Sequence, residues 1–185
     1  IADAMNETRR LKKMINDLLT LTKEDYVDLV TKEEVDLEAL VKDICDDFFD
    51  IAMIQNKTLK ISSQLKHKNI LSDKNKLRQL FIIFIDNAFK YTEEEDYIKI
   101  SLSEKDEKIY IKIEDNGLGI KKEELPHLFD RFFRSENVRN KDIDGSGIGL
   151  SIAKVISESL KYKLKVDSEY GKWTKFEIII PIDED

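Results

Sequence analysis

The segment from Asp73 to Tyr91 constrains the fold most, because its apolar residues leave almost no polar side for a helix. Its apolar positions are Leu77, Leu80, Phe81, Ile83, Phe84, Ile85, Ala88 and Phe89. A helix that is apolar nearly all round is buried on most sides. We therefore predict a helix over 73–91 that lies in the interior of the domain.

Two segments of alternating hydrophobicity follow this helix. Their apolar positions are Ile98, Ile100 and Leu102 in the first, and Ile109, Ile111 and Ile113 in the second. Alternation with a period of two is typical of half-buried strands, and the charged turn SEKDEK joins the two segments. We expect them to form a hairpin.

The remaining patterns predict the other elements of the domain. Asp36 is a suitable N-cap for a helix that follows it. The apolar face of that helix is Leu37, Leu40, Val41, Ile44, Phe48, Ile51 and Ala52. Shorter patterns predict a strand at 59–61, a helix at 148–156 and two closing strands at 164–166 and 176–180. This order predicts an α+β fold, a two-layer sandwich of one sheet covered by helices.

Residues 1–23 predict a long N-terminal helix that precedes this domain. Its apolar stripe is Leu11, Met14, Ile15, Leu18 and Leu19, and such a stripe needs a partner helix. Residues 24–34 are the best candidate for a linker. We therefore expect a partial helical unit over 1–30 and a catalytic domain over 31–185.

Composition excludes several classes of protein. The net charge of −7 argues against a nucleic-acid-binding surface, which needs a basic stripe. No stretch approaches the roughly 20 apolar residues of a membrane span, and the N-terminus does not resemble a signal peptide. The single cysteine, Cys45, excludes an internal disulfide and is expected to be a buried core thiol.

The stretch DGSGIGLSIAK, from Asp144 to Lys154, has glycines at every second position before a helix. It lacks the spacing of a dinucleotide-binding turn and the Gly-Lys-Ser/Thr of a P-loop, and no H-R-D loop of protein kinases occurs elsewhere. Alternate glycines nevertheless let backbone N–H groups approach a phosphate, and a helix N-terminus adds positive potential. The stretch is a candidate phosphate-binding segment.

Two further stretches carry polar residues in apolar surroundings. Asp115, in IEDNGLGI, closes an apolar alternation, so it is either a turn aspartate or a pocket carboxylate that accepts a hydrogen bond from an adenine amino group. Asn87 and Lys90, in DNAFKYT, share one helix face. Asn87 is either an ordinary helix-end residue or a ligand of magnesium, which prefers oxygen ligands and substrate phosphates.

Taken together and in this order, the stretches resemble the catalytic and ATP-binding domain of sensor histidine kinases, which has the Bergerat or GHKL fold. LRQLFIIFIDNAFKYT resembles the family's N box, EDNGLGI and GSGIGL its two glycine boxes, and LFDRFFR its phenylalanine box. The arm NETRRLKKMINDLLTLTK resembles the second helix of the dimerisation and phosphoacceptor hairpin. The resemblance covers nearly the whole chain and implies a mixed sheet covered by helices.

The resemblance also implies roles for individual residues. Asp115 would read the adenine amino group, Asn87 would hold Mg²⁺ between the ATP phosphates, and Arg134 would reach the transferring γ-phosphoryl group. The catalytic residues would be Asn87, Lys90 and Arg134. The complete implied ATP site is Asn87, Lys90, Tyr91, Asp115, Gly117, Gly119, Ile120, Phe132, Arg134, Gly145, Ser146, Gly147, Ile148, Gly149, Leu150 and Thr174. Phe129, Phe132 and Phe133 would dock a lid or would be ordinary core aromatics.

One residue departs from the family pattern at a chemically important place. Four residues before Asn87, where the ATP-hydrolysing relatives carry the glutamate that activates water, this chain has Ile83. Isoleucine cannot accept a proton, which favours a kinase, or a binding module without catalysis, over an ATPase. Asp86 is an alternative acid, but it is expected to face elsewhere. A serine kinase of the anti-sigma type shares the fold, although the arm disfavours it.

The two histidines, His67 and His127, are predicted to lie on the surface, and neither resembles a phosphoacceptor. The family carries its phosphoacceptor histidine upstream of the arm, so we expect this chain to be a fragment that phosphorylates a histidine outside it. The resemblance further implies a homodimer in the full-length protein, a response regulator as partner, and a cytoplasmic location as part of a membrane-bound sensor.

Overall fold

The computed structural model of the chain describes residues 30–135 and 145–182. The elements in these ranges are β1 (Glu33–Asp36), α3 (Leu37–Ile54), β2 (Thr58–Gln64), β3 (Asn69–Ser72), α4 (Lys74–Lys90), β4 (Tyr97–Lys105), β5 (Lys108–Asp115), the short 3₁₀ helix η1 (Leu125–His127), α6 (Gly149–Ser159), β6 (Lys163–Glu169) and β7 (Trp173–Pro181). The predicted N-terminal helix lies outside the described residues, as does most of the unit predicted over 1–30.

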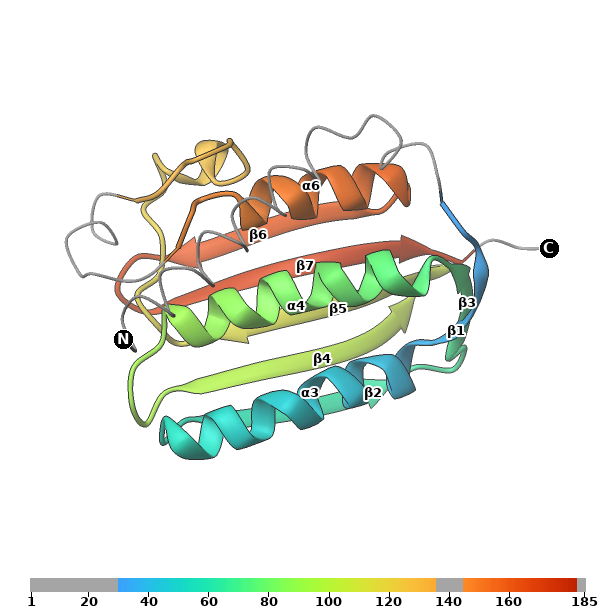
Figure 1. Ribbon diagram of the computed structural model, residues 1–185, viewed down its shortest axis with the longest axis horizontal. Helices are drawn as coiled ribbons and strands as arrows, with labels where there is room; N and C mark the ends of the chain where they lie inside the picture. Colours follow the sequence, from blue (N-terminus) through green and yellow to red (C-terminus); the bar gives the residue numbers. More distant parts are fainter. Residues whose placement is uncertain (1–29, 136–144, 183–185) are drawn as a thin grey trace, which may run out of the picture.

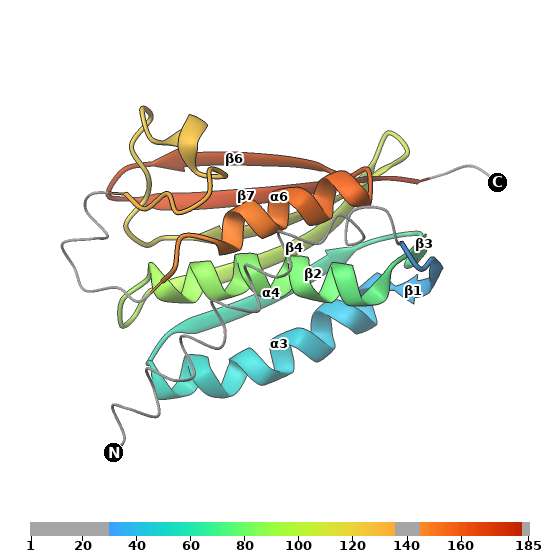
Figure 2. The ribbon, with the colours of Figure 1, turned by 45° about the horizontal axis from the view of Figure 1, so that its top comes forward.

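The main sheet has five strands in the order β2-β4-β5-β7-β6. Strand β2 pairs with β4 in parallel, and the other neighbours are antiparallel, so the sheet is mixed. Helices α3, α4 and α6 lie side by side on one face of this sheet, as Figures 1 and 2 show. The predicted α+β sandwich with a mixed sheet covered by helices is confirmed.

Helix α4 lies between α3 and α6 and forms the centre of the helical layer (Figure 1). It packs Leu77, Leu80, Phe81 and Phe84 into the core, each at most 1% exposed. The prediction of a buried helix is therefore confirmed, with one difference. Ile82 is 39% exposed, so one strip of α4 points away from the sheet.

Strands β4 and β5 form the predicted hairpin. On β5 the buried residues Ile109, Ile111 and Ile113 alternate with half-buried Tyr110 and Lys112. Because successive side chains point to opposite faces of a strand, the isoleucines contact the helical layer and the polar residues face the open side of the sheet. This register also carries Asp115, at the end of β5, to the helix-covered face.

Two aspartates cap the long helices, and they differ in burial. Asp36 caps α3 by accepting a hydrogen bond from the Ala39 amide at 2.9 Å, in an exposed setting. Asp73 is 7% exposed, caps α4 through the Lys76 amide at 3.0 Å, and also accepts from the Thr31 amide at 3.1 Å. Asp73 therefore also holds the segment that enters the domain.

We expect Asp73→Ala to lower the free energy of unfolding by about 2 kcal/mol, because it leaves the buried amide of Lys76 and the part-buried amide of Thr31 without an acceptor. The matched variant Asp36→Ala should cost about 1 kcal/mol or less, because water can replace an exposed cap. Urea denaturation followed by circular dichroism measures both. Equal losses would show that the burial of Asp73 and its second contact, with the Thr31 amide, add nothing to stability.

Two features of the fold differ from the sequence prediction. Strands β1 and β3 form a separate two-stranded antiparallel sheet that pairs Val35 with Ile70. The predicted linker over 24–34 therefore runs into a strand at Glu33. Ile51, placed on the buried face of α3, is 37% exposed. Four-residue strands carry too little alternation to be distinguished from a linker, and their pairing depends on distant residues.

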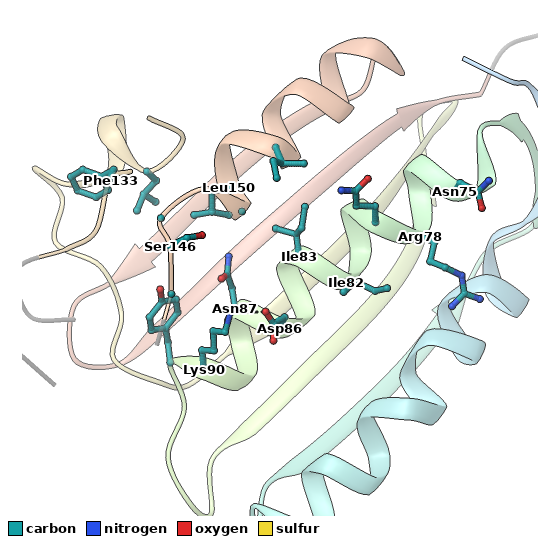
Figure 3. Close-up of a pocket in the computed structure, with 17 residues that line it drawn as sticks. Asn75, Arg78, Ile82, Ile83, Asp86, Asn87, Lys90, Phe133, Ser146 and Leu150 are labelled. Atoms are coloured by element: carbon teal, nitrogen blue, oxygen red, sulfur yellow. Dashed lines mark hydrogen bonds and ion pairs between the residues drawn. The ribbon is translucent and has the colours of Figure 1, made fainter. Parts of the chain in front are cut away.

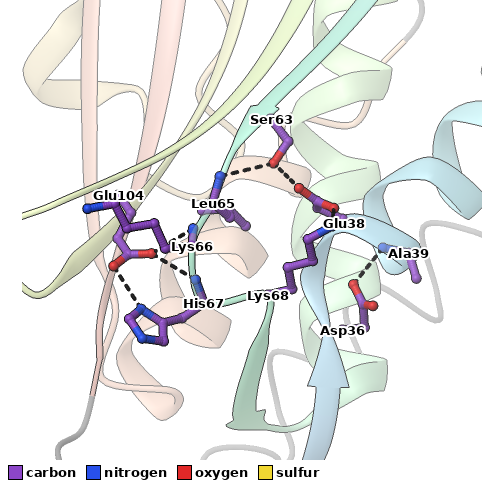
Figure 4. Close-up of polar contacts among 9 residues, drawn as sticks. All are labelled: Asp36, Glu38, Ala39, Ser63, Leu65, Lys66, His67, Lys68 and Glu104. Carbon is purple, nitrogen blue, oxygen red and sulfur yellow. Dashed lines mark hydrogen bonds and ion pairs between the residues drawn. The ribbon is translucent and has the colours of Figure 1, made fainter.

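The turn between β2 and β3 is held by acidic side chains (Figure 4). Glu104 accepts hydrogen bonds from the amides of Lys66 and His67, both at 3.0 Å, and contacts the His67 ring at 2.8 Å. These hydrogen bonds, first the one from the His67 amide, hold the pKa of Glu104 below its ordinary value. The His67 side chain is 65% exposed, and that of His127 is 60% exposed, so the predicted surface positions are confirmed.

The sole cysteine and the helices agree with the expectations from composition. Cys45 is fully buried on α3, and burial raises the pKa of its thiol to about 12, which makes it an unreactive core residue. None of the helices within residues 30–135 and 145–182 is long and apolar enough to cross a membrane.

Candidate functional site

Two adjoining cavities lie beside α4, the larger along most of the helix from Asn75 and the smaller at its C-terminal end. The larger has a volume of about 330 Å³ and the smaller about 70 Å³. They share five lining residues, Asn87, Tyr91, Leu128, Phe133 and Leu150. These residues form a wall common to both cavities, so the two cavities lie next to each other.

The larger cavity lies between α4 and the segment that leads into α6 (Figure 3). From α4 it takes a stripe of residues spaced three or four apart, Asn75, Gln79, Ile83, Asn87 and Lys90 among them. Opposite this stripe stand Gly145, Ser146, Gly147, Gly149 and Leu150. The predicted phosphate-binding segment and the predicted magnesium ligand therefore line the same space.

The smaller cavity lies at the end of the sheet. Asp115 on β5 and Thr174 on β7 are direct partners in the strand pairing, so their side chains lie next to each other on one face. Gly119 and Ile120 border them, from the loop after β5, and Arg134 comes from the segment after η1. The lining also includes polar Asn87 and Ser135 and apolar side chains such as Phe176.

Asp115 is buried in an environment that disfavours its charge. It is 3% exposed, and its Oδ1 accepts a hydrogen bond from the Gly117 amide at 3.0 Å. Burial raises the pKa of Asp115 to about 7, while the Gly117 amide opposes this shift. A carboxylate that lies in a cavity although burial disfavours its ionisation is characteristic of a binding site rather than of a surface turn.

This pKa makes ligand binding by Asp115 dependent on pH. If the ionised carboxylate accepts a hydrogen bond from the ligand, affinity is highest above pH 7 and falls as the group is protonated below it. We expect the dissociation constant for adenosine, which does not itself ionise in this range, to rise about tenfold between pH 8 and pH 6. Residual binding by Asp115→Asn should be independent of pH over that range.

Gly117 lets the loop after β5 pass close to the end of α4. A Cβ atom on Gly117 would lie 2.1 Å from the Tyr91 carbonyl oxygen, which accepts a hydrogen bond from the Leu118 amide at 3.0 Å. No side chain fits at that distance from backbone. Gly117 does not line either cavity. Its role is to let the loop take this position, not to contact a ligand.

Gly147 joins the glycine segment, residues 145–149, to the segment that contains Phe132 and Phe133. Its φ is +71°, and its carbonyl accepts a hydrogen bond from the Phe132 amide at 3.0 Å. Phe133 turns towards both cavities, whereas Phe132 is 56% exposed and lines neither. Phe132 was predicted as a site residue, but Phe133, rather than Phe132, lines the cavities.

Asp86 was expected to face away from the site, and this expectation is wrong. It lines the larger cavity and forms an ion pair with Lys90 at 2.6 Å, as Figure 3 shows. Residues four apart lie on one helix face, and the cavity is wide enough to contact both Asp86 and its neighbour Asn87. The pair places a carboxylate and an ammonium group together beside the Asn87 amide.

Most of the predicted site residues surround the two cavities. The exceptions are Gly117, Phe132 and Ile148. The Ile148 side chain is fully buried. The lining residues that sequence reasoning did not assign to the site include Asn75, Arg78, Gln79, Ile82, Leu118, Leu128, Ser135, Ile152 and Phe176. The polar residues on α4 could have been found, because Asn75, Gln79 and Asn87 recur at helical spacing in an otherwise apolar helix.

The polar groups near Asn87 fit a magnesium ion held with a phosphate. The Asn87 carboxamide makes no hydrogen bond within residues 30–135 and 145–182, so its oxygen is available to a ligand. The Asp86 carboxylate lies in the same cavity. Magnesium commonly takes one or two protein oxygens and completes its shell with water and phosphate. In the part of the chain that the structure describes, no cluster of three or more His, Cys, Asp or Glu residues offers an alternative metal site.

Comparisons with known proteins identify the family of the chain. Residues 72–184 match the family described as histidine kinase-, DNA gyrase B-, and HSP90-like ATPase. Sensor protein CiaH of Streptococcus pneumoniae is 33% identical over 183 residues, covering 98% of this chain and 40% of the relative. Sensor histidine kinase WalK of Bacillus subtilis is 31% identical over 185 residues, covering 97% of this chain and 30% of the relative. The chain thus spans less than half of these relatives.

Solved structures show the same fold. Histidine kinase AdeS of Acinetobacter baumannii superposes with a TM-score of 0.80 at 24% identity, covering 99% of this chain and 84% of that one. Histidine kinase ThkA, solved in complex with the response regulator protein TrrA, gives a TM-score of 0.79 at 22% identity, covering 97% of this chain and 49% of that one. With the family match spanning more than half of its length, the chain belongs to the histidine kinase-, DNA gyrase B- and HSP90-like ATPase family.

Proposed function

We propose that the two cavities form one ATP site and that the chain is the ATP-binding catalytic part of a sensor histidine kinase. It would transfer the γ-phosphoryl group of ATP to a histidine outside this chain. The observation that carries the proposal is that the two cavities share lining residues. A pocket with a buried carboxylate therefore lies directly beside a glycine-lined space next to Asn87. A base and a polyphosphate need these two kinds of surroundings.

In this arrangement the smaller cavity holds the adenine. The Asp115 carboxylate has one oxygen engaged by the Gly117 amide, which leaves the second oxygen for the adenine amino group. Tyr91 and Phe133, at the junction, would contact the base and the ribose. Burial raises the pKa of Tyr91, so it stays neutral.

The larger cavity holds the phosphates. The amides of the glycine segment and the N-terminus of α6 at Gly149 supply partial positive charge. Lys90 lines this cavity and Arg134 lines the smaller one; we propose that both stabilise charge on the transferring group. Asn87 would hold Mg²⁺, which when bound neutralises phosphate charge.

Ile83 bears on whether the γ-phosphoryl group is transferred to a protein or hydrolysed by water. It lines the larger cavity, and its Cγ2 lies 3.7 Å from where a Cβ on Gly149 would stand, so it packs α4 against the start of α6. The Asp86 carboxylate in the same cavity is engaged by Lys90 at 2.6 Å, and Ile83 offers no base to a water molecule. Hydrolysis is therefore disfavoured. The same absence supports the second candidate, a nucleotide-gated interaction module that binds partners without catalysis.

Phosphoryl transfer is tested by mixing the chain with a separate phosphoacceptor hairpin from a related sensor kinase and ATP labelled on its γ-phosphate. We expect acid-labile label on the hairpin histidine, and loss of at least about 100-fold in rate with Asn87→Ala. ATP binding without transfer would favour the interaction module. Rapid release of phosphate by the chain alone would contradict both proposals and indicate an ATPase.

The remaining expectations concern the full-length protein. We propose that it is a homodimer through the unit over 1–30 and passes its phosphoryl group to a response regulator. It would act as the cytoplasmic part of a membrane-bound sensor. Support comes from the relatives named as sensor proteins and from the ThkA complex with a response regulator.

A further inference from the structure

Ser168, on β6, lies behind the smaller cavity and joins three parts of its wall. It is 6% exposed and does not line the cavity. Its Oγ accepts a hydrogen bond from the Ile120 amide at 2.8 Å and lies 2.6 Å from the Trp173 carbonyl oxygen. The same Oγ lies 3.1 Å from the hydroxyl of Thr174. Ile120 and Thr174 both line the cavity.

The number of hydrogens fixes the direction of these three contacts. A serine hydroxyl has one hydrogen to donate and two lone pairs that accept. A carbonyl oxygen only accepts, so the Ser168 hydrogen goes to Trp173. The Ile120 amide takes one lone pair. The remaining lone pair can only accept, and Thr174 must therefore donate its hydrogen to Ser168.

The consequence for the cavity is that Thr174 presents lone pairs alone. Its only hydrogen points back into the wall, so it can accept but not donate a hydrogen bond on the cavity side. Asp115, its direct partner across the strand pair, is also an acceptor when ionised. The wall of the cavity at Asp115 and Thr174 then offers two neighbouring acceptors.

We propose that Ser168 is a positioning residue that fixes Thr174 as an acceptor and thereby selects 6-aminopurine over 6-oxopurine nucleotides. The inference rests on the proposed function, since it assigns the base of the proposed ligand. A 6-amino group carries two N–H donors, which match two acceptors. A 6-oxo group would place a carbonyl oxygen against one of them, and facing acceptors leave both without a partner.

The test compares the dissociation constants of ATP and ITP, which carries a 6-oxo group, at pH 8 with the intact chain. The wild-type chain should bind ATP at least about tenfold more tightly than ITP. Ser168→Ala frees the Thr174 hydrogen, which can then turn towards a 6-oxo group. The ratio of the two constants should fall by about tenfold in this variant. Loss of the Ile120 contact should weaken both nucleotides equally and leave the ratio unaffected.

A double-mutant cycle shows whether Ser168 acts through Thr174. Thr174→Val should lower the ratio, and adding Ser168→Ala to it should lower the ratio no further. Ser168→Cys, with a weaker hydrogen-bonding group of similar shape, should give an intermediate ratio, and it replaces Ser168→Ala if that variant does not fold. An unchanged ratio in a folded Ser168 variant overturns the inference alone. Failure of the wild-type chain to bind either nucleotide overturns the proposed function as well.

Discussion

Replacing Asp115 with Asn is expected to weaken Mg-ATP binding by about 100-fold, the largest effect on affinity of any single change in the site. The carboxylate has two oxygens, and the Gly117 amide takes one at 3.0 Å. An Asn side chain has a single oxygen, so it can serve Gly117 or the adenine amino group but not both. Its NH₂ group would face a donor. Calorimetric titration at pH 8 measures the loss, and a change of less than about threefold would contradict the assignment.

The same variant should make the empty domain more stable, which separates loss of function from unfolding. The folded pKa of Asp115 is about 7 against an ordinary value of 3.8. Ionisation therefore costs stability as pH rises from about 4 to about 7, by up to about 4 kcal/mol. Asp115→Asn removes this cost above pH 7. A gain of about 2 kcal/mol would raise the melting temperature at pH 8 by about 4 to 8 °C.

The pH dependence of this gain is its control. Below pH 7 the folded wild-type chain keeps Asp115 protonated, so the advantage of the variant should shrink as pH falls towards 4. Thermal scans at pH 8, 6 and 4.5 follow it. A variant that is less stable than the wild-type chain at pH 8 would show that Asp115 is not a strained, desolvated carboxylate.

Gly117→Ala is expected to lower the free energy of unfolding by about 3 kcal/mol or more, a large stability effect for a one-carbon change. The added Cβ would lie 2.1 Å from the Tyr91 carbonyl oxygen and 3.0 Å from Asp115 Oδ1. A clash with backbone cannot be relieved by rotating a side chain. The loop after β5 must therefore move, and the base-binding carboxylate moves with it.

Gly145→Ala is the matched control, because a Cβ there meets nothing within 4 Å. Gly145 has no positive φ, so the change should alter the free energy of unfolding by about 0.5 kcal/mol or less. Denaturation in urea, followed by circular dichroism, compares the two variants. Similar stabilities for Gly117→Ala and Gly145→Ala would mean that the close approach of the loop to Tyr91 is wrong.

The central elements of the fold were predictable because their periodicity records burial. Helix α4 and the β4–β5 hairpin each show a long apolar pattern of a single period. Their observed ends lie within two residues of the predicted ones, except that β4 continues three residues further, to Lys105. The small β1–β3 sheet was not predictable in this way. Its pairing of Val35 with Ile70 depends on contacts across 35 positions, which local patterns do not contain.

The site was predictable as a set of segments but not in its hydrogen bonding. Motif order identified Asn87, Asp115 and the glycine segment, which the structure brings around adjoining cavities. Asp86 was misplaced because helical spacing gives the direction of a side chain but not the width of the cavity beside it. Ser168 carries no sequence signal of its own, since its role arises only when β6 and β7 pair and bring it to Thr174.

A crystal structure of the chain with Mg²⁺ and a non-hydrolysable ATP analogue tests most directly whether the two cavities form one nucleotide site. We predict the purine amino group at Asp115 in the smaller cavity, the phosphates between Asn87 and the segment from Gly145 to Gly149, and the ribose beside Tyr91 and Phe133. Density for the analogue in only one cavity, with the other filled by side chains, or elsewhere on the surface, would contradict the account.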